Sequence, residues 1–392
     1  MRKKGSDEGL TRKDFLQRCL CYSLGFSAAP AALLASREAQ GQERRRGFVR
    51  DRLASYYRSL ENGFVLCELC PHLCVVGPGQ RGKCGVREHR DGQYLTLVYG
   101  NPCAVHVDPI EKKPLFHFLP GSRAYSIATA GCNLHCRYCQ NWEISQRRPE
   151  ETYNIDRPPE KLVAEALQTG CRSIAYTYSE PVIFYEYVMD TATLAQERGI
   201  KNVLVTAGYI NPVPQRELCR VVDAANVDLK GFTEDFYRDV CSGRLKPVLD
   251  ALVLFKEEGV WLEVTNLVLP TLNDDLAQIR KMCQWMSRNL GDDVPLHFSR
   301  FYPRYKLKNL PPTPVETLDR AREAALEVGL KYVYVGNVPG HAGNNTYCPH
   351  DSRLLIQRRG YSLIQYHIDD GKCQFCGEPI PGVWNGGHPS SS

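Results

Sequence analysis

The chain has 392 residues, of which 43% are hydrophobic and 24% are charged, a balance that excludes a disordered chain and a multi-span membrane protein. The net charge of +5 comes from residues 1–50, which hold eleven Lys and Arg against five Asp and Glu, so the rest of the chain carries a net charge of −1. The body of the protein therefore lacks the overall basic charge that favours nucleic acid.

Cysteine is unusually frequent, with 17 in the chain, and eleven of these occur in close clusters of two, three or four. Cysteines separated by only a few residues rarely bridge one another, but they readily converge on one metal, and such sites are usual in an intracellular redox setting. We therefore expect metal sites rather than a disulfide framework. The length predicts one large module with smaller ones beside it.

Residues 1–46 are interpreted as a leader followed by a linker. Residues 11–16 precede an uncharged stretch at 19–36, and together they resemble a twin-arginine export signal in which Lys13 replaces the second Arg. The proline, serines and glycine of that stretch make it a poor membrane span. Export in folded form and a leader without targeting function are both compatible with this pattern. Residues 43–46 are expected to be solvated.

Residues 47–121 form a Cys-rich region that ends in short strands and turns. Four of its cysteines follow the pattern C-x2-C-x3-C-x9-C. Four thiolates can close a tetrahedral zinc site or hold an additional iron–sulfur cluster, and they leave no coordination position open. We expect a structural or electron-relay role, with His72 and His89 nearby as substitute ligands. The four cysteines are Cys67, Cys70, Cys74 and Cys84.

Residues 122–342 alternate short β-rich apolar runs with helix-length intervals. This order predicts repeated βα units, and hence an α/β fold with a parallel sheet or a partial TIM-like (β/α) barrel. Helices are expected over residues 159–167 and 313–328, where apolar residues recur at a spacing of three to four. In such a fold the chemistry belongs at the carboxyl ends of the strands. The expected strands are residues 124–129, 173–178, 202–206, 226–229, 261–269, 295–301 and 332–335.

The cysteines Cys132, Cys136 and Cys139 directly follow the first of these strands, with the spacing C-x3-C-x2-C. Three thiolates on one loop can bind three corners of a cubane iron–sulfur cluster and leave one iron without a protein ligand. An open position marks a catalytic metal rather than a structural one. The alternatives are a zinc knuckle with a distant fourth ligand and three core thiols. The position at a strand end and the aromatic Tyr138 favour the cluster.

In residues 343–392, β-rich runs no longer alternate with helix-length intervals. These residues are expected to form a small module resembling a zinc ribbon. A zinc ribbon combines two C-x2-C knuckles. Here Cys373 and Cys376 make one knuckle, but Cys348 is followed by Asp351 where the second cysteine is expected. Because zinc also accepts carboxylate and imidazole ligands, either Asp351 or His350 completes the site, or the metal has been lost.

The central motif resembles the signature of the radical S-adenosylmethionine superfamily, and the surrounding chain resembles its branch related to pyruvate formate-lyase activating enzyme. More narrowly, residues 55–385 resemble the radical enzyme of the AmmeMemoRadiSam system. The resemblance implies a radical S-adenosylmethionine barrel in residues 122–342, between a Cys-rich segment and a zinc-ribbon-like module. The segments that carry it are residues 67–84, 132–145, 176–181, 263–273, 295–303 and 345–384.

The resemblance implies that the three central cysteines hold a 4Fe-4S cluster whose open iron chelates S-adenosylmethionine. One electron then cleaves the sulfonium, and the resulting 5′-deoxyadenosyl radical abstracts hydrogen from a substrate, while the protein orients the reactants and excludes water. The family pattern places Tyr138 beside the adenine, Glu180 at the methionine ammonium, and Asp228 with Lys230 at the methionine end. A packing aromatic and a structural ion pair are the alternatives for Tyr138 and for the pair.

Four further polar residues lie at strand ends or in a polar strand. Thr206 and Asn266 are candidates for polar contacts with the cofactor or the substrate. Residues 295–303 are unusually polar for a buried strand, so His297, Arg300 or both are expected to face the pocket. A hydrogen-bonded structural histidine and a surface ion pair of the arginine are the alternatives.

The function implied is that of an activating-enzyme-like radical enzyme of oxidoreductase type that activates or modifies a partner protein. The alternatives are methylation or rearrangement of a small molecule, and a metal-stabilised binding module without catalysis. The implied partners are Memo-type and AMMECR-type proteins, in place of the glycyl radical enzyme of the related activating enzymes, together with a low-potential electron donor. The requirement for S-adenosylmethionine and for an external electron donor favours the cytoplasm over export. No nucleic acid partner and no stable membrane span are expected.

Overall fold

The computed structural model describes residues 44–384, so the export-like part of the leader, within residues 1–43, lies outside the described residues. The described part of the expected solvated linker is exposed, and its strand β1 (Arg45–Arg46) also pairs antiparallel with β10 (Tyr153–Asn154). The backbone alone forms this two-residue ladder, so the arginine side chains remain in solvent.

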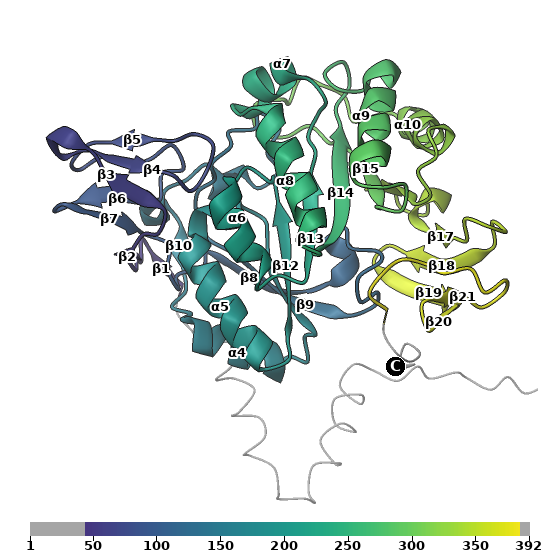
Figure 1. Cartoon of the computed structure of the whole chain (residues 1–392), viewed down its shortest axis with the longest axis horizontal. Coiled ribbons are helices and arrows are strands. Elements are labelled where there is room, and N and C mark those ends of the chain that lie inside the picture. Colours follow the sequence, from purple (N-terminus) through teal and green to yellow (C-terminus); the bar gives the residue numbers. More distant parts are fainter. Residues whose placement is uncertain (1–43, 385–392) are drawn as a thin grey trace, which may run out of the picture. The chain divides into compact units, whose positions relative to one another are not determined.

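An eight-stranded sheet forms the centre of the described chain, and seven of its strands are parallel (Figure 1). All seven predicted strands are confirmed, and so is the α/β class with a mostly parallel sheet. Their residues are largely buried, as expected for parallel strands that are covered on both faces. The parallel strands are β9 (Arg123–Ala128), β11 (Ser173–Tyr176), β12 (Lys201–Thr206), β13 (Ala224–Asp228), β14 (Trp261–Val268), β15 (Leu296–Arg300) and β16 (Val333–Gly336).

The eighth strand, β8 (Ala104–Pro109), belongs to the region expected to form only small strands and turns. It pairs antiparallel with β9 over six residues and becomes one edge of the central sheet, while β16 forms the other edge. No described strand joins these two edges, so the sheet is open. The N-terminal region is thereby fixed to the first parallel strand.

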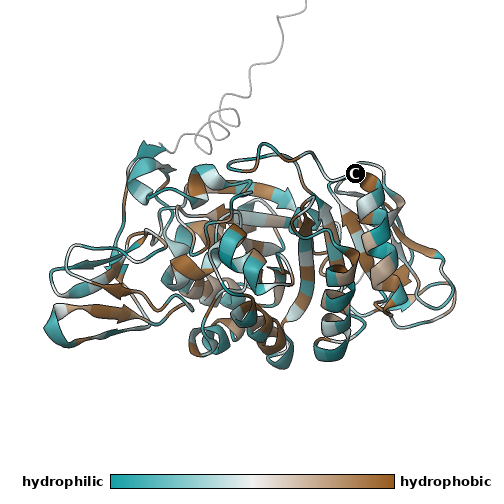
Figure 2. Cartoon of the chain, turned by 90° about the horizontal axis from the view of Figure 1, so that it is seen from above, coloured by the Kyte–Doolittle hydropathy of each residue, from teal (hydrophilic) through white to brown (hydrophobic). Residues whose placement is uncertain are grey.

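Six helices of eight or more residues follow the strands, and Figure 1 shows α4, α5, α6 and α8 in front of the sheet. Figure 2 shows polar and apolar stretches alternating along the helices around the sheet, as expected when one side is buried. The two predicted helices are confirmed as α4 and α10. Helix α10 begins at Val315 because Pro314 disfavours the helical conformation of Thr313. The helices are α4 (Pro159–Gln168), α5 (Tyr185–Glu197), α6 (Pro212–Cys219), α8 (Leu245–Glu257), α9 (Leu276–Asn289) and α10 (Val315–Glu327).

Two three-stranded antiparallel sheets carry the N-terminal cysteines. A buried ion pair joins one of them to helix α5, since the Arg87 guanidinium lies 2.5 Å from the Glu186 carboxylate and both side chains are at most 5% exposed. A buried pair of this kind is costly to break because either partner alone would be an uncompensated charge. The strands are β2 (Arg52–Leu53), β6 (Arg87–Arg90) and β7 (Gln93–Thr96), and β3 (Tyr57–Ser59), β4 (Val65–Cys67) and β5 (Val75–Val76).

The last described residues form short antiparallel strands that contact the segment before β9. The buried Arg358 donates to the Phe116 carbonyl at 3.0 Å, and Val383 N donates to the His117 carbonyl at 2.7 Å. Within residues 44–384, no helix combines the length and apolar character that a bilayer crossing requires. The strands are β17 (Thr346–Tyr347), β18 (Leu354–Arg359), β19 (Ser362–Tyr366), β20 (Ile368–Asp369) and β21 (Lys372–Cys373).

Candidate functional site

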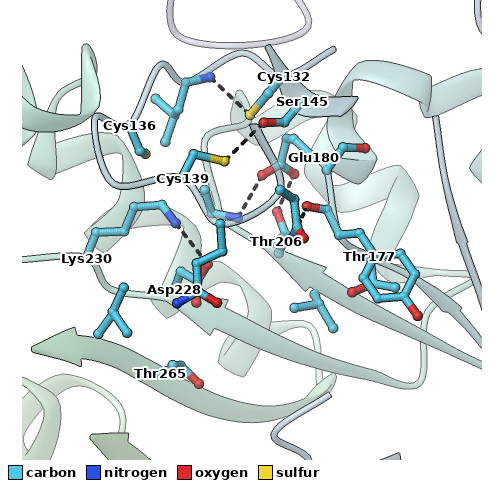
Figure 3. Close-up of a pocket in the computed structure, with 18 of the residues that line it drawn as sticks. Cys132, Cys136, Cys139, Ser145, Thr177, Glu180, Thr206, Asp228, Lys230 and Thr265 are labelled. Atoms are coloured by element: carbon cyan, nitrogen blue, oxygen red, sulfur yellow. Dashed lines mark hydrogen bonds and ion pairs between the residues drawn. The ribbon is translucent and has the colours of Figure 1, made fainter. Parts of the chain in front are cut away.

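The carboxyl ends of the parallel strands surround a cavity of about 480 Å³, which we call the first cavity. The loop after β9, the turn after β11 and the ends of β12, β13 and β15 all contribute to its wall. Figure 3 shows three cysteines, two carboxylates and one ammonium group around this space. The cavity is lined by Cys132, Cys136, Cys139, Glu180, Thr206, Asp228, Lys230 and Ser299, among others.

The loop that carries the three cysteines is held from both sides. Its backbone donates hydrogen bonds from His135 and Arg137 to carbonyls of the π-helical turn Tyr237–Cys241, at 3.0 and 2.9 Å. At Gly131 the backbone has a φ of +92°, and a Cβ there would lie 2.5 Å from a methyl of Val86. Only glycine fits this position, because any side chain would be both strained and crowded. The loop is therefore set in one conformation.

The three central thiols line one cavity. Three thiolates around one space can hold three irons of a cubane cluster and leave the fourth iron without a protein ligand.

A fourth cysteine, Cys241, lies beside the central motif, and sequence reasoning missed it. Its thiol donates to Cys136, which lowers the pKa of Cys136 to about 7, and its sulfur lies 3.8 Å from the Tyr138 hydroxyl. A thiolate is the form that binds metal, so the lowered pKa favours the ligand state of Cys136. No sequence signal marks Cys241, because a long-range contact brings it to the motif.

Glu180 is 2% exposed, and its carboxylate accepts hydrogen bonds from uncharged donors only. The Thr206 hydroxyl donates to Oε1 at 2.6 Å, and the amides of Ala207 and Val182 donate at 2.8 and 3.2 Å. Burial raises the pKa of this carboxyl. No Lys, Arg or His of the described chain forms an ion pair with it, so its charge suits a cationic ligand.

Asp228 and Lys230 form the predicted ion pair, with Lys230 Nζ donating to Asp228 Oδ2 at 2.8 Å. Both residues line the first cavity, and Lys230 is the more buried of the two. Burial opposes the charge on Lys230, but the interactions with Asp228, Cys136 and Cys241 together outweigh it and raise the pKa of the amine. The pair therefore presents a fixed cation and a more exposed carboxylate to the same space.

The other predicted residues divide by the side of the strand on which they lie. Thr206 and Tyr138 line the first cavity, but Asn266 does not, since its amide donates to the Leu229 carbonyl. Arg300 lines neither cavity and donates to the Thr313 carbonyl, so of the two residues expected singly or together at the pocket it is His297 that lines one. Side chains alternate along a strand, and the neighbours of these two residues take the cavity positions.

A second cavity of about 640 Å³ adjoins the first and shares Ser299, Asn337 and Tyr361 with its wall. Tyr361 belongs to the turn between β18 and β19, so the C-terminal strands help to enclose it. Glu111, also in the wall, is 2% exposed, and one of its carboxyl oxygens lacks a hydrogen-bond partner among the described residues. Burial raises the pKa of Glu111 to about 6.

His297 lines this second cavity, as expected, and is held by Glu263, which sequence reasoning missed. His297 Nε2 lies 2.7 Å from a carboxylate oxygen of Glu263, and the ring packs between Phe116 and Tyr334. Because Nε2 faces Glu263, the other ring nitrogen, Nδ1, is left without a hydrogen-bond partner in the described chain. A carboxylate inside the apolar run of β14 was the available sequence signal.

The N-terminal cysteines also come together, and they line a small cavity with His72, Arg87, Tyr94 and Asn133. His72 Nε2 lies 2.6 Å from the Asn133 carbonyl, and His89 is not part of the cavity wall. The two histidines are therefore not gathered with the thiols as a pair of substitute ligands. The four thiols are those of Cys67, Cys70, Cys74 and Cys84.

The C-terminal set is compact and can hold one metal ion. The sulfurs of Cys348, Cys373 and Cys376 and a carboxylate oxygen of Asp351 all lie within 4.8 Å of one another. His350 is exposed and is not part of this group. Of the two fourth ligands expected from the sequence, the geometry thus offers the carboxylate.

Comparison with known proteins gives one family. The model of the Radical SAM superfamily matches residues 126–283. An uncharacterized protein of Methanocaldococcus jannaschii is 46% identical over 84% of this chain and 98% of its own length. The pyruvate formate-lyase-activating enzyme of Clostridium pasteurianum is 25% identical over 54% of this chain and 91% of its own. A 7-carboxy-7-deazaguanine synthase of Methanothermobacter thermautotrophicus is 30% identical over 32% and 48%.

The matched family segment begins within β9 and ends within α9, and so includes the loop of three cysteines, Glu180 and the Asp228–Lys230 pair. Membership implies a 4Fe-4S cluster and S-adenosylmethionine, for which the first cavity offers three thiols and charges of both signs. The homology extends to activating enzymes of pyruvate formate-lyase. The chain is a radical enzyme and belongs to the Radical SAM superfamily.

Proposed function

We propose that the first cavity, at the top of a partial TIM-like barrel, binds a 4Fe-4S cluster and S-adenosylmethionine, and that the enzyme activates or modifies a partner protein. The observation that carries the proposal is the meeting of Cys132, Cys136 and Cys139 with Glu180 and an ion pair around one cavity. When bound, the cluster and cofactor supply reductive cleavage of the sulfonium and a 5′-deoxyadenosyl radical.

The residues of the chain divide the binding of these groups between them. The three central thiolates would hold three irons and leave the fourth iron for the amino and carboxylate groups of the cofactor. Glu180 would accept a hydrogen bond from that amino group, since the hydrogen-bond donors that the described chain offers to its buried carboxylate are all uncharged. Lys230, held by Asp228, faces the methionine end, and Tyr138 packs near the adenine.

The second cavity provides the place for the substrate. It adjoins the first through Ser299, Asn337 and Tyr361, so a group bound there lies next to the cofactor position. His297 is fixed by Glu263 and offers Nδ1 for a hydrogen bond in this wall. The protein thus holds the substrate and limits water around it.

The partner is proposed to be a protein of the AmmeMemoRadiSam system, of Memo type or AMMECR type, by the resemblance of residues 55–385 to the radical enzyme of that system. A low-potential one-electron donor completes the system and places the reaction in the cytoplasm. Comparing the intact masses of both partner types before and after turnover tests this assignment. A mass change or a radical signal on either partner supports it, and its absence from both would contradict it.

The second candidate is methylation or rearrangement of a small molecule. The second cavity favours it, since about 640 Å³ is enough for a small organic substrate. A relative over part of the chain is a 7-carboxy-7-deazaguanine synthase, which is named for a small-molecule product. A methylated or rearranged small product from cell extract, with both partner proteins unchanged in mass, would favour this candidate.

Anaerobic reconstitution with iron and sulfide, followed by reduction with S-adenosylmethionine present, tests the chemistry itself. Formation of 5′-deoxyadenosine by the full chain, and its loss in Cys136→Ala, is the expected result. A full chain that binds iron but forms no 5′-deoxyadenosine, or a variant that forms as much, would contradict the proposal. Such a result would leave a metal-stabilised binding module as the alternative.

A further inference from the structure

The four N-terminal cysteines belong to one small, tightly hydrogen-bonded unit. Cys67 ends β4, and its amide donates to the Cys74 carbonyl at 2.9 Å. The Lys83 amide, next to Cys84, lies 3.4 Å from the sulfur of Cys74. Hydrogen bonds from backbone amides to sulfur are typical of metal-bound thiolates, so the unit is arranged around its sulfurs.

The thiols of the N-terminal set line a common space. The C-terminal set of this same chain is compact, since its four ligand atoms all lie within 4.8 Å of one another and the sulfurs of Cys348 and Cys376 are 3.6 Å apart. Four thiols around one space can hold an iron–sulfur cluster.

Buried polar groups in the wall of this space lack partners. Nε of Arg87 and the hydroxyl of Tyr94 are buried without a hydrogen-bond partner among the described residues, and both side chains line the cavity with the thiols. The Arg87 guanidinium is shared with Glu186, so its charge is only partly free. Donors and a cation beside four sulfurs suit an anionic group with sulfide acceptors.

The unit touches the loop that carries the three central cysteines. His72 contacts the Asn133 carbonyl, and the carbonyl oxygen of Cys84 lies 2.8 Å from the position that a Cβ of Gly131 would take. Gly131 immediately precedes Cys132. The two cysteine sets are thus separated only by the backbone segments that carry them.

On its other side the unit reaches solvent. Cys84 and Lys83 line a surface groove of about 830 Å³, together with Arg148 and Lys306. The N-terminal set therefore lies beside a surface groove with basic side chains and also beside the central loop, as an intermediate site for electrons would.

We propose that Cys67, Cys70, Cys74 and Cys84 hold a second iron–sulfur cluster, which passes electrons to the cluster of the central motif. The relay rests on the proposed function, whereas the identity of the metal does not. A low-potential one-electron donor, dithionite in the assay, reduces the second cluster by one electron. The second cluster is reoxidised when the electron moves on, and no bond forms or breaks.

The test uses the full chain, reconstituted anaerobically, with Cys132, Cys136 and Cys139 all changed to Ala. This variant should keep about four iron atoms with matching sulfide, and a reduced-cluster signal in electron paramagnetic resonance. Adding Cys67→Ala and Cys70→Ala should remove that iron. The matched control, Cys348→Ala with Cys373→Ala in the otherwise native chain, should lose zinc and keep all iron.

Zinc in place of iron at the N-terminal set, or a triple variant with neither metal, would overturn the proposal. Circular dichroism of the triple variant separates loss of metal from loss of fold. If the triple variant binds iron but the native chain forms no 5′-deoxyadenosine, the proposed function is refuted while the second cluster is not.

The relay has its own readout in the same spectra. In the fully reduced native chain, two clusters this close should broaden or split each other's paramagnetic signals. The relay would be overturned if the spectrum of the native chain equalled the sum of two spectra, that of the triple variant and that of the variant with Cys67→Ala and Cys70→Ala.

Discussion

At the scale of single residues, Glu180 combines burial with a charge that the protein itself does not neutralise. Its oxygens accept from a hydroxyl and two amides, which orient the carboxylate without cancelling its charge. The sequence predicted the residue from the family pattern after β11. It could not predict the three donors, because Thr206 and Ala207 come from the end of another strand.

Glu180→Gln should weaken binding of S-adenosylmethionine by about tenfold or more, since a hydrogen bond to a charged group contributes about 1.5–3 kcal/mol. Equilibrium dialysis of the anaerobic, iron-loaded protein measures this. Glu143→Gln is the matched control, because Glu143 is exposed and lies outside the cavity wall. Equal affinities of the two variants would contradict the role of Glu180.

The same carboxyl predicts a pH dependence. Burial raises the pKa of Glu180, so it takes up a proton at a higher pH than an exposed glutamate. Cofactor affinity should therefore fall as the pH is lowered towards that raised pKa, and Glu180→Gln should lack this dependence. Identical pH profiles of native and variant protein would show that another group is responsible.

At the scale of the elements, the seven parallel strands and two of the helices could be predicted, because their apolar periodicity is local. Side-chain direction was harder to predict. The sequence left open whether His297, Arg300 or both face the pocket, and Ser299 and His297 take the cavity side of β15. Alternation allows only one of the two sets to face inward, and a strand buried on both faces carries no apolar pattern that chooses between them.

Gly131→Ala should disturb the central loop more than an ordinary glycine substitution. Both Gly131 and Gly259 have positive φ, but only at Gly131 does an added Cβ meet other atoms, while at Gly259 nothing lies within 4 Å. Strain alone costs about 1–3 kcal/mol, so the crowded site should lose more stability and also iron. Urea unfolding and iron content measure both effects. Equal losses of stability and of iron in Gly131→Ala and Gly259→Ala would contradict the steric account.

Glu263→Gln should destabilise the protein by about 2–5 kcal/mol, because this fully buried carboxylate accepts from His297, Trp261 and two amides. Burial opposes its charge, but the interactions with His297, His117 and the Phe116 amide together outweigh it and lower the pKa of Glu263. Its stabilising contribution is therefore complete above the ordinary glutamate pKa and is lost as the pH falls below it. Thermal unfolding between pH 6 and about pH 3 should show a steeper loss in the native protein than in the variant.

At the scale of the whole molecule, three cysteine sets form separate candidate metal sites. Sequence spacing pointed to all three, although the C-terminal set combines Cys348 and Asp351 with the more distant Cys373 and Cys376. Spacing could not give the distances between sulfurs, the contact between the N-terminal set and the central loop, or the part of Tyr361 in the second cavity. Those features depend on packing between segments far apart in the sequence.

The compact C-terminal set should bind one zinc ion with three thiolates and the Asp351 carboxylate. Asp351→Ala should weaken zinc binding by about tenfold or more, and Asp351→Cys should strengthen it, because thiolate is the softer ligand. Competition with a chromogenic chelator measures this. His350→Ala is the control and should leave the affinity unchanged. A loss of zinc affinity in His350→Ala, with no loss in Asp351→Ala, would reverse the ligand assignment.

The most direct test of the central claim is electron paramagnetic resonance of the reduced, anaerobic full chain with and without S-adenosylmethionine. A cluster held by Cys132, Cys136 and Cys139 alone has an iron free to bind the cofactor, so part of the signal should change when the cofactor is added and should not change in Cys136→Ala. A signal that does not change when the cofactor is added, or the absence of any iron signal, would contradict the account.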